Sequence, residues 1–243
     1  MRTSVEGLRA VVTGAGSGVG RACALRMAEL GCEVVVTGRT ASKLEETKAL
    51  SAHPERVRVR VMDVSDEDAV SSLAAELGAS GGVDILMNNA AVLVEKPFDQ
   101  IELAEFDELM RINVRGVFLM CHELLGLLRK SPAATIINVA SSAARNPYVH
   151  QTVYGASKAA VLALSKALAR EVREDGVRVH ALCPGGIATG MLAQGTRPDL
   201  EGEELMVPDD IADMVEYLLT HRTGAVIDEL VPRRVGKDPW PYA

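Results

Sequence analysis

The chain has 243 residues, 48% of them apolar, and a formal net charge of −7 at pH 7. A protein of this charge does not attract nucleic acid or an anionic membrane, and no run reaches the roughly 18 apolar residues that span a bilayer. Residues 1–7 lack the apolar segment of a secretory signal. We therefore expect a soluble, cytoplasmic protein that forms one domain over residues 1–243, and a small acidic partner would need local basic residues.

The cysteines show neither a CxxC spacing nor a Cys/His ligand spacing, and they are Cys23, Cys32, Cys121 and Cys183. We interpret them as reduced and mostly buried side chains, which fits the cytosol. No metal site is predicted.

The first predicted elements are a strand over residues 9–13, a glycine-rich turn from Gly14 to Gly20, and a helix over residues 21–30. Backbone amides at a helix N-terminus bind anions, and glycine lets a pyrophosphate approach closely. The turn has glycines at 14, 18 and 20 and so does not match GxGxxG. The turn therefore predicts a phosphate-binding site.

A second strand over 33–37, a helix over 42–50 and a third strand over 57–61 follow, and this alternation predicts a parallel sheet. Ser65 and Asp68 resemble a helix N-cap pair, which would leave Asp63 free at the carboxyl end of the third strand. Ligands bind at that edge of such sheets. The alternative, that Asp63 is a second cap or turn residue, stays open.

The fourth strand, residues 85–88, ends in Asn88-Asn89-Ala90-Ala91, which suits either contact with a ribose or an ordinary turn. A long helix is then predicted over residues 102–130 with Asn113 inside it. Asparagine is a poor helix former, so Asn113 is either a kink that bonds its own backbone or a polar group with a specific role.

A fifth strand over 135–139 places Ser141 and Ser142 at the same edge, and the next helix is predicted over 153–174. Tyr154 and Lys158 lie on one face of that helix, a turn apart. A nearby cation lowers the pKa of a tyrosine, so Tyr154 is a candidate general acid/base. Taken alone, the spacing could arise by chance.

The rest of the chain is predicted to form a sixth strand over 177–182, a helix from Pro208 and a seventh strand over 226–230. Pro184 and Gly185 fix a turn after the sixth strand. Residues 190–207 lack periodicity and are interpreted as a flexible substrate flap. The tail with Trp240 and Tyr242 has no assigned role.

Together these motifs resemble the short-chain dehydrogenase/reductase family over residues 8–230. The resemblance is carried by Thr13, Gly14, Gly18, Gly20, Asp63, Asn88, Asn89, Ala90, Asn113, Ser141, Tyr154, Lys158, Pro184, Gly185 and Thr189. It implies an α/β, doubly wound Rossmann fold, with a single seven-stranded parallel sheet flanked by helices and a nicotinamide nucleotide across its carboxyl edge.

The resemblance also implies roles for individual residues. Tyr154 would protonate a carbonyl oxygen, Ser141 would bond that oxygen, Lys158 would bind the ribose and lower the tyrosine pKa, and Asn113 would anchor a water. The expected cofactor-binding residues are Thr13, Gly14, Ser17, Gly18, Val19, Gly20, Arg39, Asp63, Val64, Asn89, Ala90, Tyr154, Lys158, Pro184, Gly185, Ile187 and Thr189.

The expected function is reduction of a carbonyl to an alcohol, or the reverse reaction, on a small-molecule substrate. Ala91 stands where the family usually has glycine, and the tail lacks the Gly-Gly ending of acyl-carrier ketoreductases. The alternatives are a 3-oxoacyl thioester reductase, a nucleotide-sensing binding protein, and a lyase or epimerase on the same fold. A homotetramer or homodimer is expected through the helices at 102–130 and 153–174, with Val161, Leu164, Leu168 and Val172 as surplus apolar surface.

NADP(H) is the expected cofactor, with NAD(H) also possible. Gly38 stands where a site selective for NAD normally has a carboxylate, and Arg39 follows it. An arginine grips a 2′-phosphate through its planar fork of donors. The alternative is that Arg39 is a solvated surface side chain.

Overall fold

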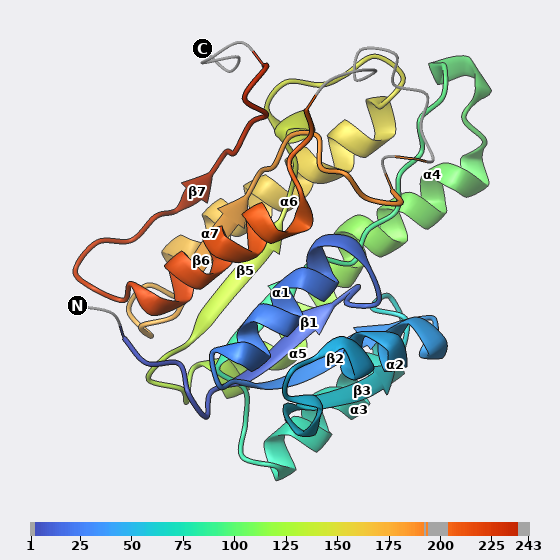
Figure 1. The fold of residues 1–243 in the computed structure, drawn as a ribbon. Coiled ribbons are helices and arrows are strands. Elements are labelled where there is room, and N and C mark those ends of the chain that lie inside the picture. Colours follow the sequence, from blue (N-terminus) through green and yellow to red (C-terminus); the bar gives the residue numbers. More distant parts are fainter. Residues whose placement is uncertain (1–2, 192, 194–203, 238–243) are drawn as a thin grey trace.

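The computed structural model describes residues 3–191, 193 and 204–237, and these residues are organised around one seven-stranded sheet (Figure 1). Neighbouring strands pair in parallel in the order β3-β2-β1-β4-β5-β6-β7. The strands are β1 (Arg9–Thr13), β2 (Glu33–Gly38), β3 (Val57–Val61), β4 (Ile85–Asn88), β5 (Thr135–Val139), β6 (Arg178–Leu182) and β7 (Glu229–Leu230). This architecture confirms the predicted fold class.

Central strands form here because their apolar residues are buried on both faces, as in other parallel sheets. Every residue of β4 and β5 is buried. Side chains alternate between faces along a strand. In β1, Val11 belongs to one hydrophobic cluster, whereas Ala10 and Val12 belong to the other.

Helices cover both faces of the sheet. One cluster joins the sheet to α3, α5 and α6, and the other joins it to α1, α2 and α7 (Figure 1). The helices are α1 (Gly18–Glu29), α2 (Ala41–Leu50), α3 (Glu67–Ala79), α4 (Leu103–Met110), α5 (Gly116–Leu128), α6 (Thr152–Glu171) and α7 (Pro208–Thr220). Short 3-10 turns occur at Pro54–Arg56, Phe98–Gln100 and Ser142–Ala144. No helix among the described residues is long and apolar enough to cross a bilayer.

The order of the strands creates a crevice between β1 and β4. From β1 the chain moves outward to β2 and β3, and it then returns to β4 on the other side of β1. Helices that follow β1 and β4 therefore diverge, which opens a space at the carboxyl ends of these strands where doubly wound sheets bind ligands.

Several helices and strands have bounds that differ from those predicted from the sequence. The helix expected over 102–130 consists of α4, a π-helix over Arg111–Arg115 and α5, and the seventh strand has two residues instead of five. Most of the expected flap lies outside the described residues, as do Trp240 and Tyr242. Where the described chain resumes, Met206 forms a parallel bridge with Ile187 in the loop after β6.

The apolar surface predicted on α6 is smaller than expected. Val161 and Val172 are fully buried in the core of the chain itself, and Leu164 and Leu168 pack against that core. A helix beside a sheet needs such a stripe for its own packing. These residues therefore do not indicate a subunit interface.

Candidate active site

The glycine turn after β1 is shaped by close approach to the loop after β4. Gly14 has φ +63°, and a Cβ there would lie 2.8 Å from Ala90 Cα. A Cβ at Gly20, inside α1, would lie 2.4 Å from Asn89 Nδ2. Neither contact leaves room for a side chain, so packing requires glycine at both positions, and at Gly14 the positive φ favours glycine as well.

Hydrogen bonds hold this turn against the loop after β4. Thr13 Oγ1 accepts bonds from the backbone amides of Asn89 and Ala90, both at 3.0 Å. Asn89 Nδ2 donates to the carbonyl oxygens of Thr13 at 3.0 Å and Gly14 at 3.2 Å. The side-chain nitrogen of Asn89 thus fixes the turn.

The N-terminus of α1 opens onto the crevice. Gly18 has φ +53°, and a Cβ there would lie 3.2 Å from Thr189 Cγ2. Ser17, the N-cap residue, makes no side-chain capping bond among the described residues. The first amides of the helix are therefore available to an anion, which the helix dipole also favours.

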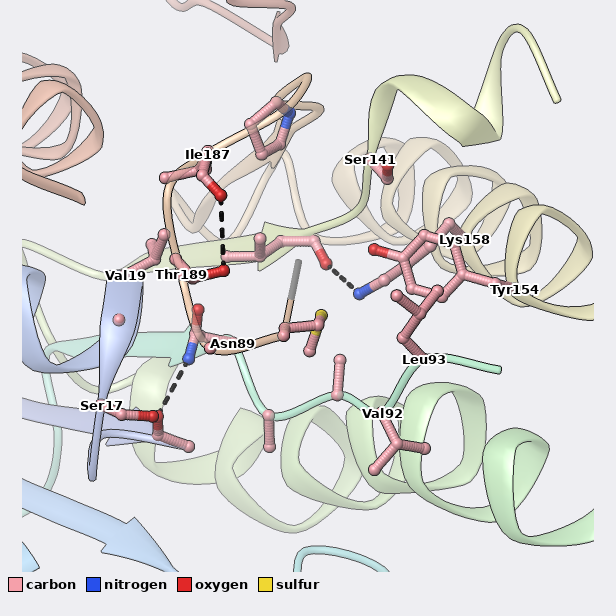
Figure 2. Close-up of a pocket in the computed structure, with 18 of the residues that line it drawn as sticks. Ser17, Val19, Asn89, Val92, Leu93, Ser141, Tyr154, Lys158, Ile187 and Thr189 are labelled. Atoms are coloured by element: carbon pink, nitrogen blue, oxygen red, sulfur yellow. Dashed lines mark hydrogen bonds between the residues drawn. The ribbon is translucent and has the colours of Figure 1, made fainter. Parts of the chain in front are cut away.

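At the other end of the crevice, Ser141 from the turn after β5 comes together with Tyr154 and Lys158 from α6 (Figure 2). Ser141 caps the turn after β5 by accepting a bond from the Ala143 amide at 3.1 Å, and it lines the same cavity as Tyr154. Lys158 Nζ donates to the Val139 carbonyl at 2.8 Å and lies 5.7 Å from the centroid of the Tyr154 ring. The one-turn spacing in α6 does place tyrosine and lysine side by side.

Burial dominates the ionisation of both groups. It raises the pKa of Tyr154 to about 12, although the Ser141 hydroxyl acts in the opposite direction. Burial also lowers the pKa of Lys158 to about 8. The sequence led us to expect that Lys158 would lower the tyrosine pKa; here desolvation outweighs any such effect, because both side chains are removed from water.

Asn113 lies in the π-helix between α4 and α5 and is fully buried. Its Oδ1 accepts a bond from the Val92 amide at 2.8 Å, and its Nδ2 donates to the Val92 carbonyl at 2.9 Å and to Ser157 Oγ at 3.1 Å. π-Bulges are frequent at functional sites. Asn113 is thus both a helix irregularity and a polar group with a specific role, because it ties the loop after β4 to α6.

Asp63 is not free, contrary to the sequence prediction. Its Oδ1 accepts bonds from the amide of Ser65 at 2.9 Å and from its hydroxyl at 2.6 Å, and its Oδ2 lies 3.3 Å from both terminal nitrogens of Arg111. Burial raises the pKa of this carboxyl, but these bonds outweigh burial and hold the pKa below its usual value. The N-cap of α3 is Asp66, which accepts from Ala69, and not the expected Ser65 with Asp68.

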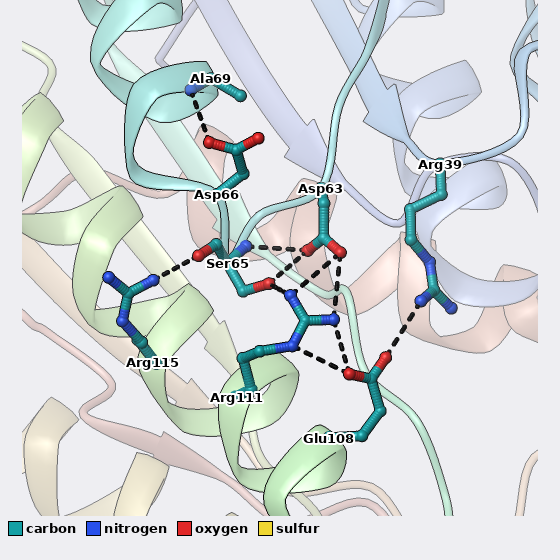
Figure 3. Close-up of polar contacts among 8 residues, drawn as sticks. All are labelled: Arg39, Asp63, Ser65, Asp66, Ala69, Glu108, Arg111 and Arg115. Atoms are coloured by element: carbon teal, nitrogen blue, oxygen red, sulfur yellow. Dashed lines mark hydrogen bonds and ion pairs between the residues drawn. The ribbon is translucent and has the colours of Figure 1, made fainter.

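Charged side chains from three parts of the chain continue this network toward Arg39 (Figure 3). Glu108 in α4 accepts a bond from Arg111 Nη2 at 2.6 Å and one from Arg39 Nη1 at 3.3 Å. Side chains of Arg39 and Glu108 are 56% and 43% exposed, so water screens this ion pair. Arg39 is therefore a surface side chain with a weak carboxylate partner.

One cavity of about 540 Å³ connects the glycine turn with Tyr154. Small-molecule sites usually have volumes of roughly 300–1,000 Å³. The predicted site residues that line it are Gly14, Ser17, Gly18, Val19, Arg39, Asp63, Val64, Asn89, Ala90, Ser141, Tyr154, Lys158, Pro184, Gly185, Ile187 and Thr189. Thr13, Gly20 and Asn113 do not appear in the lining and act from behind it, through the contacts given above.

Sequence reasoning missed other residues in the lining. Lys43 lies near Arg39, and Tyr148 and Gln151 lie near Tyr154, while Arg233, Arg234 and Lys237 come from the segment after β7. The irregular C-terminal segment gave no pattern to find the last three. The described residues contain no group of three or more His, Cys, Asp or Glu side chains that could hold a metal ion, and all four cysteines are buried and unpaired.

Comparison with known proteins identifies the family. The sequence model of the short chain dehydrogenase family matches residues 9–199. An uncharacterized oxidoreductase of Staphylococcus aureus strain USA300 is 31% identical over 227 residues, covering 93% of this chain and 96% of the relative.

Two solved structures show the same fold with different nucleotides. A 3-ketoacyl-(acyl-carrier-protein) reductase from Brucella melitensis, complexed with NADH, has a TM-score of 0.86 and 31% identity, over 95% of this chain and 97% of that one. An alcohol dehydrogenase from the archaeon Thermococcus sibiricus, complexed with 5-hydroxy-NADP, has a TM-score of 0.84 and 26% identity, over 96% and 99%. The chain belongs to the short-chain dehydrogenase family and is an oxidoreductase of that family.

Proposed function

We propose that the whole chain forms one nucleotide-binding domain that reduces a carbonyl to an alcohol, or catalyses the reverse reaction, with Tyr154 as the general acid/base. One observation carries this proposal: Ser141, Tyr154 and Lys158 line the same cavity as the uncapped N-terminus of α1. An anion site and a proton donor thus face one ligand-sized space.

The residues around the cavity fit a nicotinamide dinucleotide. Its diphosphate would lie against the amides of Ser17, Gly18 and Val19, where no side-chain cap competes for them. Asp63 and Val64 would border the adenine, and Pro184, Gly185, Ile187 and Thr189 the nicotinamide side. When bound, the nicotinamide supplies or accepts the hydride.

The chain itself supplies the proton and holds the reacting oxygen. In the reduction direction Tyr154 donates its phenolic proton to the carbonyl oxygen, while Ser141 hydrogen-bonds that oxygen. The high pKa of Tyr154 keeps it protonated in the free protein, which is the form that a general acid requires. Lys158 would bind the ribose, and its charged form would favour the phenolate of Tyr154. Asn113 holds the loop after β4 against α6 through its bonds to Val92 and Ser157.

NADP(H) is the preferred cofactor in this proposal. Arg39 and Lys43 line the cavity beyond Gly38, where two cations can meet a 2′-phosphate. Glu108 holds Arg39 only through a solvent-screened ion pair, so a phosphate can displace it. NAD(H) remains possible because the neutral ribose hydroxyls need neither cation.

A second candidate is reduction of a 3-oxoacyl thioester. It is favoured by the similarity to the Brucella melitensis reductase over 95% of this chain. The two candidates share the chemistry and differ in substrate.

One assay tests both candidates. Purified protein is mixed with NADPH or NADH and with ketones, aldehydes and 3-oxoacyl thioesters, and the loss of the reduced nucleotide is followed. We expect turnover of at least one carbonyl, faster with NADPH. Tight nucleotide binding without any turnover would instead favour a nucleotide-sensing protein, and conversion without net nucleotide oxidation would favour a lyase or epimerase.

We also propose a homodimer or homotetramer formed through α5. The support is Phe118 in α5, which is 50% exposed and stacks on His122 with ring centroids 5.5 Å apart. Exposed aromatic rings are enriched at subunit interfaces. Light scattering should give a multiple of the 25.9 kDa chain mass, and a particle of 25.9 kDa would contradict the proposal.

A further inference from the structure

The charge of the cavity is opposite to the charge of the protein. Although the chain has a formal net charge of −7, the described acidic lining consists of Asp63. The basic lining residues are Arg39, Lys43, Lys158, Arg233, Arg234 and Lys237. A cavity lined by one sign of charge concentrates ligands of the other sign.

Apart from Lys158, which lies beside Tyr154, these cations form two groups. Arg39 and Lys43 lie with the glycine turn, where the phosphates of the cofactor are expected. The other group, which we call the C-terminal basic group, consists of Arg233, Arg234 and Lys237. The phosphates of the cofactor explain the first group and leave the second unexplained.

Backbone contacts connect the C-terminal basic group to the catalytic serine. A Cβ at Gly185 would lie 3.9 Å from Arg233 Cα, and the Gly185 amide donates to the Pro232 carbonyl at 3.0 Å. The neighbouring Pro184 carbonyl accepts a bond from the Ser142 amide at 2.9 Å. Ser142 directly follows Ser141, so the group borders the Tyr154 end of the cavity.

The group is held in place by bonds within its own segment. Arg233 Nη1 donates to the carbonyl oxygens of Arg234 at 3.0 Å, Val235 at 3.1 Å and Lys237 at 2.6 Å. Arg234 is 8% exposed. Within the described chain, neither Arg233 nor Lys237 forms an ion pair with a carboxylate, whereas Arg39 does. The Arg233 guanidinium is thus ordered before a ligand arrives, which lowers the cost of binding. Lys237 is tied to the same segment through its backbone amide, which donates to the Arg234 carbonyl at 3.1 Å.

A second cavity shares the two arginines but not the lysine. Its lining includes Arg233, Arg234 and the carboxylates of Glu204, Asp210 and Asp213. Of the two cavities, Lys237 lines only the first. Lys237 is therefore the cleanest residue for a test.

We infer that the substrate is an anionic carbonyl compound or alcohol whose carboxylate or phosphate group binds the C-terminal basic group while its reacting carbon faces Tyr154. This inference rests on the proposed function and adds the substrate class. Arginine suits both oxyanions because its planar fork donates two parallel hydrogen bonds.

The test compares matched pairs of ligands that differ in charge. Levulinate is compared with methyl levulinate, and dihydroxyacetone phosphate with dihydroxyacetone, as substrates and as ligands that change the fluorescence of bound NADPH. The wild-type protein should favour the anionic member of at least one pair. The pair that responds distinguishes a carboxylate from a phosphate.

Variants then locate the interaction. Lys237→Gln should weaken the preferred anion by about 10- to 150-fold, the range of a charge-assisted hydrogen bond, and leave its neutral partner and NADPH unchanged. Lys237→Arg should retain most of the preference. Lys130→Gln, which removes the same charge beyond α5 at the opposite edge of the sheet, should change nothing. Arg233→Gln provides a second variant of the group.

The outcomes separate the inference from the proposed function. Equal use of anionic and neutral ligands by the wild type, or a Lys237→Gln effect on NADPH instead of on the anion, would overturn the inference. Absence of turnover with every carbonyl, despite NADPH binding, would overturn the proposed function, while the fluorescence comparison would still decide whether the basic group binds an oxyanion.

Discussion

The two ends of the cavity are built in different ways. At the catalytic end, Lys158 is buried beneath Tyr154, and burial shifts the pKa of both groups. At the adenosine end, Arg39 and Glu108 are about half exposed and paired through water-screened charges. Buried groups interact strongly with their surroundings, whereas exposed pairs contribute little. In the proposed function, the buried end carries the chemistry and the exposed end selects the nucleotide.

The largest expected effect lies at the catalytic end. Tyr154→Phe removes the transferable proton and should lower turnover by about 10²- to 10⁴-fold, the usual contribution of a general acid/base, with NADPH affinity almost unchanged. Steady-state kinetics and fluorescence titration measure the two quantities. Tyr148→Phe is the matched control, because Tyr148 lines the same cavity and its hydroxyl bonds Ser142 at 2.9 Å. Retention of more than a tenth of the turnover by Tyr154→Phe would remove its assigned role.

The buried lysine should make stability depend on pH. The pKa of Lys158 is about 8 in the folded protein, whereas an ordinary lysine has a pKa of 10.5. Between these two values the unfolded chain therefore binds more protons than the folded one. Stability therefore rises with pH in this window, by at most about 1.4 kcal/mol per pH unit.

Denaturant unfolding at a series of pH values checks this expectation. Lys158→Met should lack this contribution, so the difference between the wild type and the variant is the quantity to follow. The buried cysteines and Tyr154, whose pKa values burial raises to about 12, oppose the trend at high pH in both proteins. Parallel curves for the two proteins would show that Lys158 titrates normally.

A smaller effect is expected from Arg39 at the adenosine end. Arg39→Ala should weaken NADPH by about 10- to 150-fold, because a charge-assisted bond to the 2′-phosphate is lost, and should leave NADH almost unchanged. Titrating both nucleotides decides the matter, with Arg39→Lys as a variant that keeps the charge but loses the planar fork. Equal losses for the two nucleotides, or tighter binding of NADH by the wild type, would mean that Arg39 does not select the phosphate.

The smallest effect is expected from the partner of Arg39. Glu108→Gln removes a competitor for the guanidinium and should strengthen NADPH by at most about fivefold, the worth of an exposed ion pair, without changing NADH. Glu174→Gln removes the same charge from a side chain that is 88% exposed and serves as the control. Weaker NADPH binding in Glu108→Gln would show instead that Glu108 holds Arg39 in its binding position.

Local patterns in the sequence predicted most of the fold. The bounds of β1 to β6 agree with expectation within one residue, because runs of buried β-branched residues end at glycine, proline or polar residues. β7 was harder to predict, because it consists of only the two residues that pair with β6, whereas the apolar run in the sequence begins at Val226. The π-helix at Asn113 follows from contacts with Val92 and Ser157, which no local pattern reveals.

The site shows the same limit. The glycine pattern predicts the phosphate side of the cavity, and the tyrosine–lysine spacing predicts the catalytic side. Both could be predicted because turns and helix faces depend on residues close together in the sequence. The partners of Asp63 were missed, since Arg111 is 48 residues away in the chain and Ser65 looked like a helix cap. The spacing of Glu108 and Arg111, three residues apart on a helix, was the one local sign of the network. The C-terminal basic group had no such sign.

The central claim is that the cavity carries hydride transfer coupled to proton transfer by Tyr154. The most direct measurement uses NADPH that carries deuterium at both hydrogen positions of nicotinamide C4 and a ketone that the protein reduces, with the alcohol analysed by mass spectrometry. We predict that the wild-type product gains one deuterium and that Tyr154→Phe, with NADPH bound equally well, forms that product at least about 100-fold more slowly. An alcohol without deuterium, or an equal rate in the variant, would contradict the claim.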